Sequence, residues 1–294
     1  MKRKLIKQGI GGCTIFLPIS WIRTQNLKPG DEIELNIDED KIIVEGVGKS
    51  FRKTKNIDLG DDGDIGKIQN MISSSYKAGY DEMIIHCTNL PKLHSLNKIV
   101  ESFTGLEITD QTRNILKIRC FLENDASTIE GMIIKLFQTI YTLIEHIKNP
   151  VISMEDITDM VTINIKRMKN FITRMIQSSN HGKDHSYEYH SMVADLEKIA
   201  LDLQRYASYL IASKSLPSKV FLEYSKQFSL VYQAYLKKDF KDLHRLWSSQ
   251  RDWGYSKDVV AKKPEKKVSA ENIYLYSMVN RLRDITTKMM VIFS

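Results

Sequence analysis

The sequence predicts a multidomain α+β protein, because its patterning changes twice along 294 residues. Residues 1–48 hold short apolar stretches punctuated by glycine and proline, which is typical of a small β-rich domain. Strand and helix patterns alternate over residues 67–122, which indicates a small α/β region. Helical periodicity runs almost throughout residues 123–294, which predicts an all-α C-terminal domain. Residues 49–66 are expected to form a linker.

The N-terminal domain is expected to contain short strands, one short helix and a hairpin. An apolar run at 13–17 predicts a strand, and Pro18 after it suits the first turn of a helix. The Lys-Pro-Gly-Asp sequence at 28–31 is typical of a tight turn. Apolar and polar residues alternate over 33–37, and a second apolar strand follows at 41–44. A domain this small buries too little core alone, so we expect it to pair with a second copy or to rest on other parts of the chain.

Five stretches of this domain follow one another in a specific order: 3–7, 14–18, 21–22, 27–33 and 42–44. Together they resemble the AbrB/SpoVT swapped-hairpin DNA-binding domain, in which two chains interlock into one barrel. In that family, basic residues on the paired N-terminal strands touch DNA. The resemblance therefore implies a swapped-hairpin β-barrel shared by a homodimer and bound to double-stranded DNA. The residues that it places against the phosphates are Arg3, Lys4, Lys7 and Arg23.

The basic residues of the first predicted strand also have a plainer interpretation. Lysine is common on the exposed edges of sheets, where it discourages pairing with other chains. The formal net charge of +7 makes the surface mildly attractive to polyanions, but it does not establish DNA binding by itself. Both interpretations stay open at the level of composition, and the order of the five stretches favours DNA.

The linker carries aspartates at positions 58, 61, 62 and 64, which raises the alternative of a calcium site. Their spacing does not match an EF-hand loop, so a solvated linker that ends in the N-cap of the next helix is favoured. The α/β region is expected to form a small sheet covered by two helices. The predicted helices lie at 68–76 and from Pro91 onward, and the predicted strands lie at 82–87, 106–108 and 115–118.

The C-terminal domain is expected to contain six helices in two groups of three, arranged as a pair of antiparallel three-helix bundles. The predicted helices are 124–147, 155–176, 189–212, 217–237, 239–247 and a last helix from 270 onward. Polar loops are expected at 178–187 and 256–267.

Several segments of the α/β region and of the helices carry a second resemblance: 77–83, 105–108, 128–132, 166–168 and 196–200. They are similar to the archaeal PhoU-type regulators, which carry an AbrB-like domain ahead of a PhoU helical domain. The resemblance covers nearly the whole chain. It implies a PhoU-like pair of three-helix bundles related by a pseudo-twofold axis, and a role in phosphate uptake.

PhoU helices often carry acidic pairs at i, i+4, which stack on one helix face and bind metal clusters. In this chain the pairs are interrupted, because Leu201 stands four places after Glu197 and Asn280 stands four places before Asp284. A basic residue, Lys166, occupies a further acidic position. Glu197 and Asp284 therefore remain weak metal candidates that we expect to pair with lysines and arginines, and no cofactor is predicted.

The cysteines and apolar segments bear on the compartment. Cys13, Cys87 and Cys120 stand far apart within apolar stretches, so we expect buried free thiols and a reducing, cytoplasmic setting. No apolar run reaches the length of a membrane span, and no signal peptide is visible, so membrane insertion is not expected. No nucleophile motif or phosphate-binding glycine loop occurs, which argues against an enzyme.

Taken together, the sequence favours a homodimeric, DNA-binding transcriptional regulator of phosphate uptake and homeostasis. One alternative is an accessory protein without a DNA role, whose helical domain docks on a phosphate transporter or a signalling protein. Another is a metal-binding helical bundle, against which the interrupted acidic pairs count.

Overall fold

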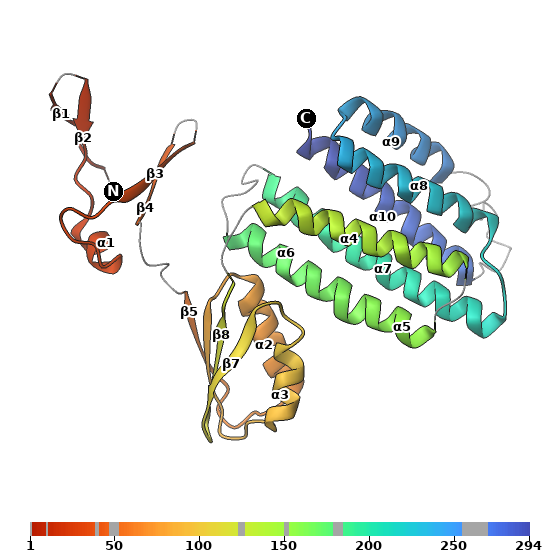
Figure 1. The fold of residues 1–294 in the computed structure, drawn as a ribbon, viewed down its shortest axis with the longest axis horizontal. Helices are drawn as coiled ribbons and strands as arrows, with labels where there is room; N and C mark the ends of the chain where they lie inside the picture. Colours follow the sequence, from red (N-terminus) through yellow and green to blue (C-terminus); the bar gives the residue numbers. More distant parts are fainter. Residues whose placement is uncertain are drawn as a thin grey trace. The chain divides into compact units, whose positions relative to one another are not determined.

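The computed structural model describes residues 2–9, 11–38, 41–46, 53–122, 127–149, 153–178, 185–254 and 270–294. It has the mixed α+β content that the sequence predicts, with small sheets before a long helical region (Figure 1). The chain divides into two compact units, residues 1–53 and residues 54–294. No helix among the described residues combines the length and the apolar character that crossing a membrane requires.

The first unit contains two antiparallel β-ribbons and one short helix. Strand β1 (Ile6–Gln8) pairs with β2 (Gly12–Thr14), α1 (Ile19–Thr24) follows, and β3 (Ile33–Asp38) pairs with β4 (Lys41–Gly46). The ribbons form separate two-stranded sheets, so the described strands of a single chain do not close into a barrel. The expected basic first strand is shorter than predicted, because Arg3 and Lys4 precede β1.

Local sequence explains the helix and the turn of this unit. Pro18 has φ −62° and stands immediately before α1, as its fixed backbone angle predicts. In the turn after the helix, the Lys28 amide donates to Asp31 Oδ2 at 2.7 Å. Gly30 has φ +98°, a conformation that residues with a Cβ rarely adopt. Both sequence predictions for this part of the unit are confirmed.

The α/β region of the second unit is a four-stranded sheet with two helices on one face (Figure 1). The sheet order is β5-β6-β8-β7, with β5 parallel to β6 and the other pairs antiparallel. Its elements are β5 (Thr54–Asp58), α2 (Ile65–Lys77), β6 (Glu82–His86), α3 (Leu93–Val100), β7 (Leu106–Gln111) and β8 (Ile115–Cys120). Alternate residues of β8 are buried, so one sheet face forms the core with the helices, as predicted.

The expected linker at 49–66 is wrong in part, because Thr54–Asp58 forms strand β5. Residues 49–52 lie outside the described part of the chain. The aspartates that follow β5 organise the turn into α2, where Asp64 accepts the Lys67 amide at 2.7 Å. Asp62 pairs with the Lys67 ammonium, also at 2.7 Å. The predicted N-cap is therefore confirmed, and these carboxylates serve local hydrogen bonds and an ion pair.

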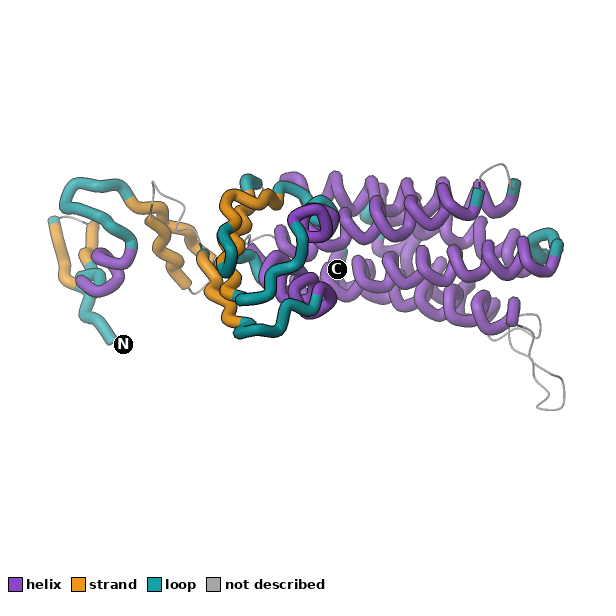
Figure 2. Tube along the Cα trace, turned by 90° about the horizontal axis from the view of Figure 1, so that it is seen from below, coloured by secondary structure: helices purple, strands orange, loops and turns teal. Residues whose placement is uncertain are grey.

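The helical region contains six helical rods in its described residues, which lie side by side (Figure 2). They are α4 (Ser127–Lys148), the continuous rod of α5 (Met154–Asp159), η1 (Met160–Ile165) and α6 (Lys166–Ser178), then α7 (Ser186–Ser213), α8 (Lys219–Lys237), α9 (Phe240–Gly254) and α10 (Ala270–Ile292). All six predicted helices are confirmed, although α9 is longer than predicted. The second rod contains a π-helical turn, η1, that the periodicity did not predict. Within the two predicted loops, residues 179–184 and 256–267 lie outside the described chain.

Buried apolar residues from all six rods form one continuous hydrophobic cluster. On α4 the fully buried positions Ile129, Ile133, Phe137 and Ile140 recur every three or four residues, which places them on one face of the helix. The strongest packing between helices joins α7 to α10. The rods therefore share one core.

One arginine joins the α/β region to the helices. Arg174 of α6 is fully buried, and its Nη1 donates to the carbonyl oxygens of Tyr80 at 2.6 Å and Tyr76 at 3.2 Å. Its Nη2 donates to Asp81 Oδ1 at 2.6 Å. Since a buried guanidinium is tolerated only with such partners, these bonds fix the end of α2 against α6.

Candidate functional site

The four residues predicted to contact DNA all lie in the first unit and are all exposed. Arg3 and Lys4 precede β1, Lys7 lies on β1, and Arg23 lies in the last turn of α1. None of the four forms an ion pair with the described part of the chain. Their charges are therefore not neutralised by a described carboxylate, and each is accessible to an anionic partner.

The first unit also exposes apolar side chains, and none of its described side chains is buried. Ile37 of β3 and Ile42 of β4 stand opposite each other in the ribbon and are 80% and 67% exposed. Leu5 and Phe16, which flank the other ribbon, are each about 70% exposed. Exposed apolar surface of this kind is costly in water, and the described side chains of this unit form no core within one chain.

The cysteines reflect the same difference between the units. Cys87 and Cys120 are buried in the α/β core as free thiols, which confirms the prediction for both. Cys13 is exposed, so the prediction of a buried thiol is wrong there. The physical reason is that β2 has no described layer packed over it in a single chain.

The carboxylate of the weak metal candidate Glu197 forms an ion pair with a lysine. This carboxylate lies 3.0 Å from Lys169 Nζ, and both side chains are less than one-fifth exposed. Burial lowers the pKa of Lys77, and the nearby positive charge of Lys169 lowers it further. Burial likewise lowers the pKa of His190 below its usual value of 6.5, helped by Lys169 and then by Lys77. Glu197 thus lies among basic side chains, which is an unfavourable setting for a cation.

The other weak candidate, Asp284, lies exposed on α10 and forms no ion pair with the described residues, so the expected pairing with a lysine or arginine is wrong for Asp284. The two candidates are not brought together as one ligand set. Within the ranges that the structure describes, no group of three or more histidine, cysteine, aspartate or glutamate side chains is arranged to hold a metal ion.

Two buried carboxylates that sequence reasoning missed lie between α7 and α10. Asp195 and Asp202 are 7% and 5% exposed and stand seven residues apart, which places them on one helix face. Arg281 bridges them, with its Nε 3.4 Å from Asp202 Oδ2 and its Nη1 3.7 Å from Asp195 Oδ1. Lys288 pairs with Asp195, and Ser277 donates to Asp202 at 2.7 Å.

A signal for this network was present in the sequence. Asp195 and Asp202 are separated by seven residues, and so are Arg281 and Lys288. Two helices that pack antiparallel can match such spacings, because residues seven apart share a face over two turns. The i, i+4 acidic pairs that the PhoU resemblance points to lie within one helix, so they do not reveal a network that joins two helices.

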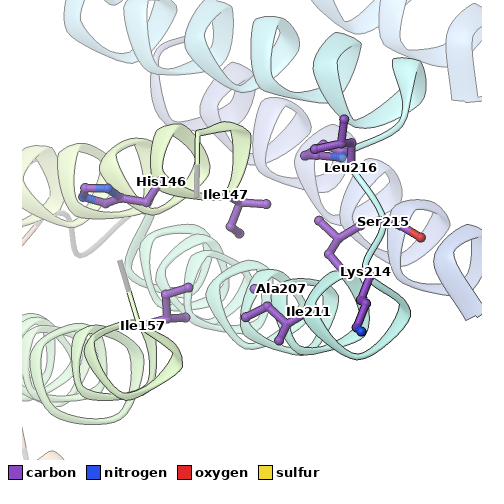
Figure 3. Close-up of a pocket in the computed structure, with 10 residues that line it drawn as sticks. His146, Ile147, Ile157, Ala207, Ile211, Lys214, Ser215 and Leu216 are labelled. Carbon is purple, nitrogen blue, oxygen red and sulfur yellow. The ribbon is translucent and has the colours of Figure 1, made fainter. Parts of the chain in front are cut away.

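A small apolar pocket of about 210 Å³ opens at one end of the helical region (Figure 3). Ile147 of α4, Ile157 of α5 and Ile211 of α7 contribute to its walls, and Leu216 follows α7 (Figure 3). His146 and Lys214 are its charged or titratable members. A site with this lining can hold a small apolar group, and it offers no arrangement of catalytic side chains.

No protein-family model, no curated protein and no solved structure matches the chain.

Proposed function

We propose that this protein is a homodimeric DNA-binding regulator of transcription whose first unit both pairs the chains and contacts DNA. The observation that carries the proposal is the combination, in one small unit, of exposed cations without described carboxylate partners and of apolar side chains without a core. Each half of that combination calls for a different partner, one apolar and one anionic.

We propose that a second copy of the same unit covers the exposed apolar side chains. Leu35, Ile37 and Ile42 expose 56%, 80% and 67% of their surface on the β3–β4 ribbon. Pairing two ribbons would bury these side chains at a gain of about 25 cal/mol per Å² of apolar area. It would also cover strand edges that otherwise invite uncontrolled pairing. The resemblance to AbrB/SpoVT domains supports an interlocked, swapped-hairpin form of this dimer.

We propose that the exposed basic side chains of this unit bind nucleic acid. In a dimer, Arg3, Lys4, Lys7 and Arg23 are each present twice, so the basic surface doubles. Lysine and arginine side chains that neutralise phosphates release counterions, which drives binding and makes it depend on salt. A phosphate-homeostasis role for the regulator is supported by the similarity of the chain to archaeal PhoU-type proteins, with a helical domain that receives the signal.

The experiment is a fluorescence-anisotropy titration of promoter fragments over a salt series. We expect the Arg3→Ala/Lys4→Ala variant to bind more weakly than wild type. Its plot of log affinity against log salt should also be flatter, since each lost phosphate contact removes about 0.9 from the slope. Circular dichroism should show unchanged helical content, because both residues are exposed and lie outside the helices.

A matched control variant distinguishes a specific DNA-binding site from a general effect of net charge. Lys219→Ala/Lys241→Ala removes the same charge from exposed positions of the second unit. We expect its affinity and salt slope to stay close to those of wild type. Equal effects of both variants, or no DNA binding by wild type at low salt, would reject the proposal.

A second candidate function is docking on a phosphate transporter or a signalling protein without DNA binding. The observation in its favour is that α8 exposes three leucines, Leu222, Leu230 and Leu236, which are 41–47% exposed. If wild type binds no DNA, this surface is the next one to test. Replacement of the three leucines by glutamine should then abolish binding to the purified partner.

A further inference from the structure

A cleft of mixed polarity lies between α4 and the rod that contains η1 and α6. Its volume is about 430 Å³, which falls within the range of sites for small molecules. On one wall, α4 presents Met132, Lys135 and Thr139, which recur at helical spacing on one face. The facing wall consists of Asn164, Arg167 and Met168.

The charge of this cleft is uniformly positive. Lys135 and Arg167 are both exposed, and neither pairs with a carboxylate in the described chain. No aspartate or glutamate of the described residues lines the cleft. Two cations facing one cavity repel each other, so an anion bound between them would relieve that repulsion and gain charge-assisted hydrogen bonds.

Arg167 is oriented before any ligand arrives. Its Nε donates to the Thr104 hydroxyl at 3.3 Å, from the turn between α3 and β7. Its terminal nitrogens then remain for a ligand, and a guanidinium matches the geometry of a phosphate through two parallel bonds. Asn164 adds an amide donor, whereas the Thr139 hydroxyl in the cleft wall already donates to the Lys135 carbonyl at 2.8 Å.

The backbone beside these residues is unusual. The turn Met160–Ile165 is a π-helix, a rare conformation that occurs frequently at functional sites. Asn164 belongs to this turn, and Arg167 follows it on α6. The irregular turn therefore forms part of the cleft wall.

We propose that this cleft binds a phosphate-type oxyanion, either free phosphate or the monoester of a small metabolite. Lys135 and Arg167 bind the oxyanion, and the Asn164 amide supplies a further hydrogen bond. Met132 and Met168 offer an apolar surface for the remainder of an ester. The site lies wholly in the second unit, so it does not depend on DNA binding by the first.

The test is isothermal titration calorimetry on the full chain with inorganic phosphate, glycerol 3-phosphate and glycerol. We expect one equivalent of a phosphate compound to bind per chain and glycerol not to bind. Arg167→Gln and Lys135→Gln should each weaken binding by roughly tenfold or more, as loss of a hydrogen bond to a charged group does. Equal affinities for phosphate and its ester would identify the free anion as sufficient, and a tighter ester would identify a phosphorylated metabolite.

Two controls keep the result specific. Lys219→Gln/Lys241→Gln removes the same charge elsewhere on the helices, and Arg3→Ala/Lys4→Ala removes it from the first unit. Both should bind like wild type, and circular dichroism should show that every variant is folded. The proposal is overturned if folded wild type binds neither phosphate compound in the millimolar range. It is also overturned if an Arg167→Gln/Lys135→Gln double variant binds like wild type, or if the controls lose as much affinity.

Discussion

At the scale of single residues, the carboxylates between α7 and α10 show how the helical region tolerates charge in its interior. Asp195 and Asp202 are nearly buried, and an ionised carboxylate in such a place is costly unless it is paired. Arg281 and Lys288 supply the opposite charge from the neighbouring helix. The two acids are therefore neutralised by the chain itself.

This network predicts an unequal response to the loss of two arginines. Arg281→Met leaves Asp202 and Asp195 with fewer partners, so we expect the free energy of unfolding to fall by roughly 2–3 kcal/mol. Arg245→Met removes an exposed arginine that lies 3.7 Å from Asp242, and we expect a loss below about 1 kcal/mol. Urea denaturation of both variants measures the difference, and equal losses would show that the buried acids do not need Arg281.

Some residue roles could be read from the sequence and others could not. The expectation that Glu197 pairs with a basic residue is confirmed by Lys169. Asp202 and Arg281 are 79 positions apart in the sequence, and their pairing depends on how α7 and α10 pack together. Such a contact is set by tertiary structure, which local periodicity does not determine.

At the scale of elements, the attachment of the α/β region to the helices depends on α6. Arg174 carries hydrogen bonds to Tyr76, Tyr80 and Asp81, all at or just after the end of α2. Gly79 has φ +78° and ends α2 in the left-handed conformation that glycine favours. This turn presents the carbonyl groups to which the Arg174 guanidinium donates its hydrogen bonds.

Arg174 should therefore be far more sensitive to replacement than Arg167, which lies seven residues earlier on the same helix. Arg174→Met removes a fully buried guanidinium together with its ion pair to Asp81 and its hydrogen bonds to the carbonyls of Tyr76 and Tyr80, so we expect a loss of about 3–5 kcal/mol in the free energy of unfolding. Arg167→Met changes an exposed side chain and should cost less than about 1 kcal/mol. Chemical denaturation compares the two, and hydrogen exchange should show faster exchange in α2 of Arg174→Met. Similar stability of both variants would contradict the assigned role of Arg174.

Element prediction succeeded where one face of the element is apolar. The buried residues Ile129, Ile133, Phe137 and Ile140 mark α4 in the sequence as clearly as in the structure. Strand β5 escaped prediction because Thr54, Lys55 and Asn56 are polar and only Ile57 is buried among its residues. Its existence depends on parallel pairing with β6, which lies beyond α2.

At the scale of the whole molecule, the two units differ in how their apolar residues are covered. The second unit buries two hydrophobic clusters, one in the α/β region and one among the helices. The first unit has no buried side chain among those described. The second unit thus has what it needs to fold within one chain, whereas for the first we propose that a second copy supplies the missing cover.

This difference predicts the behaviour of a chain that begins at Thr54. Removal of residues 1–53 leaves both hydrophobic clusters intact, so we expect the thermal unfolding midpoint to change by no more than a few degrees. Without the exposed apolar ribbons, we expect the shortened protein to be a monomer and the full chain to be a dimer. Light scattering coupled to size-exclusion chromatography measures the masses.

A shortened chain that remains dimeric would place the interface on the second unit, and one that fails to fold would show that the first unit supports the helices. Persistence of phosphate binding in a monomeric, folded fragment would further separate the cleft of the second unit from the pairing of the first.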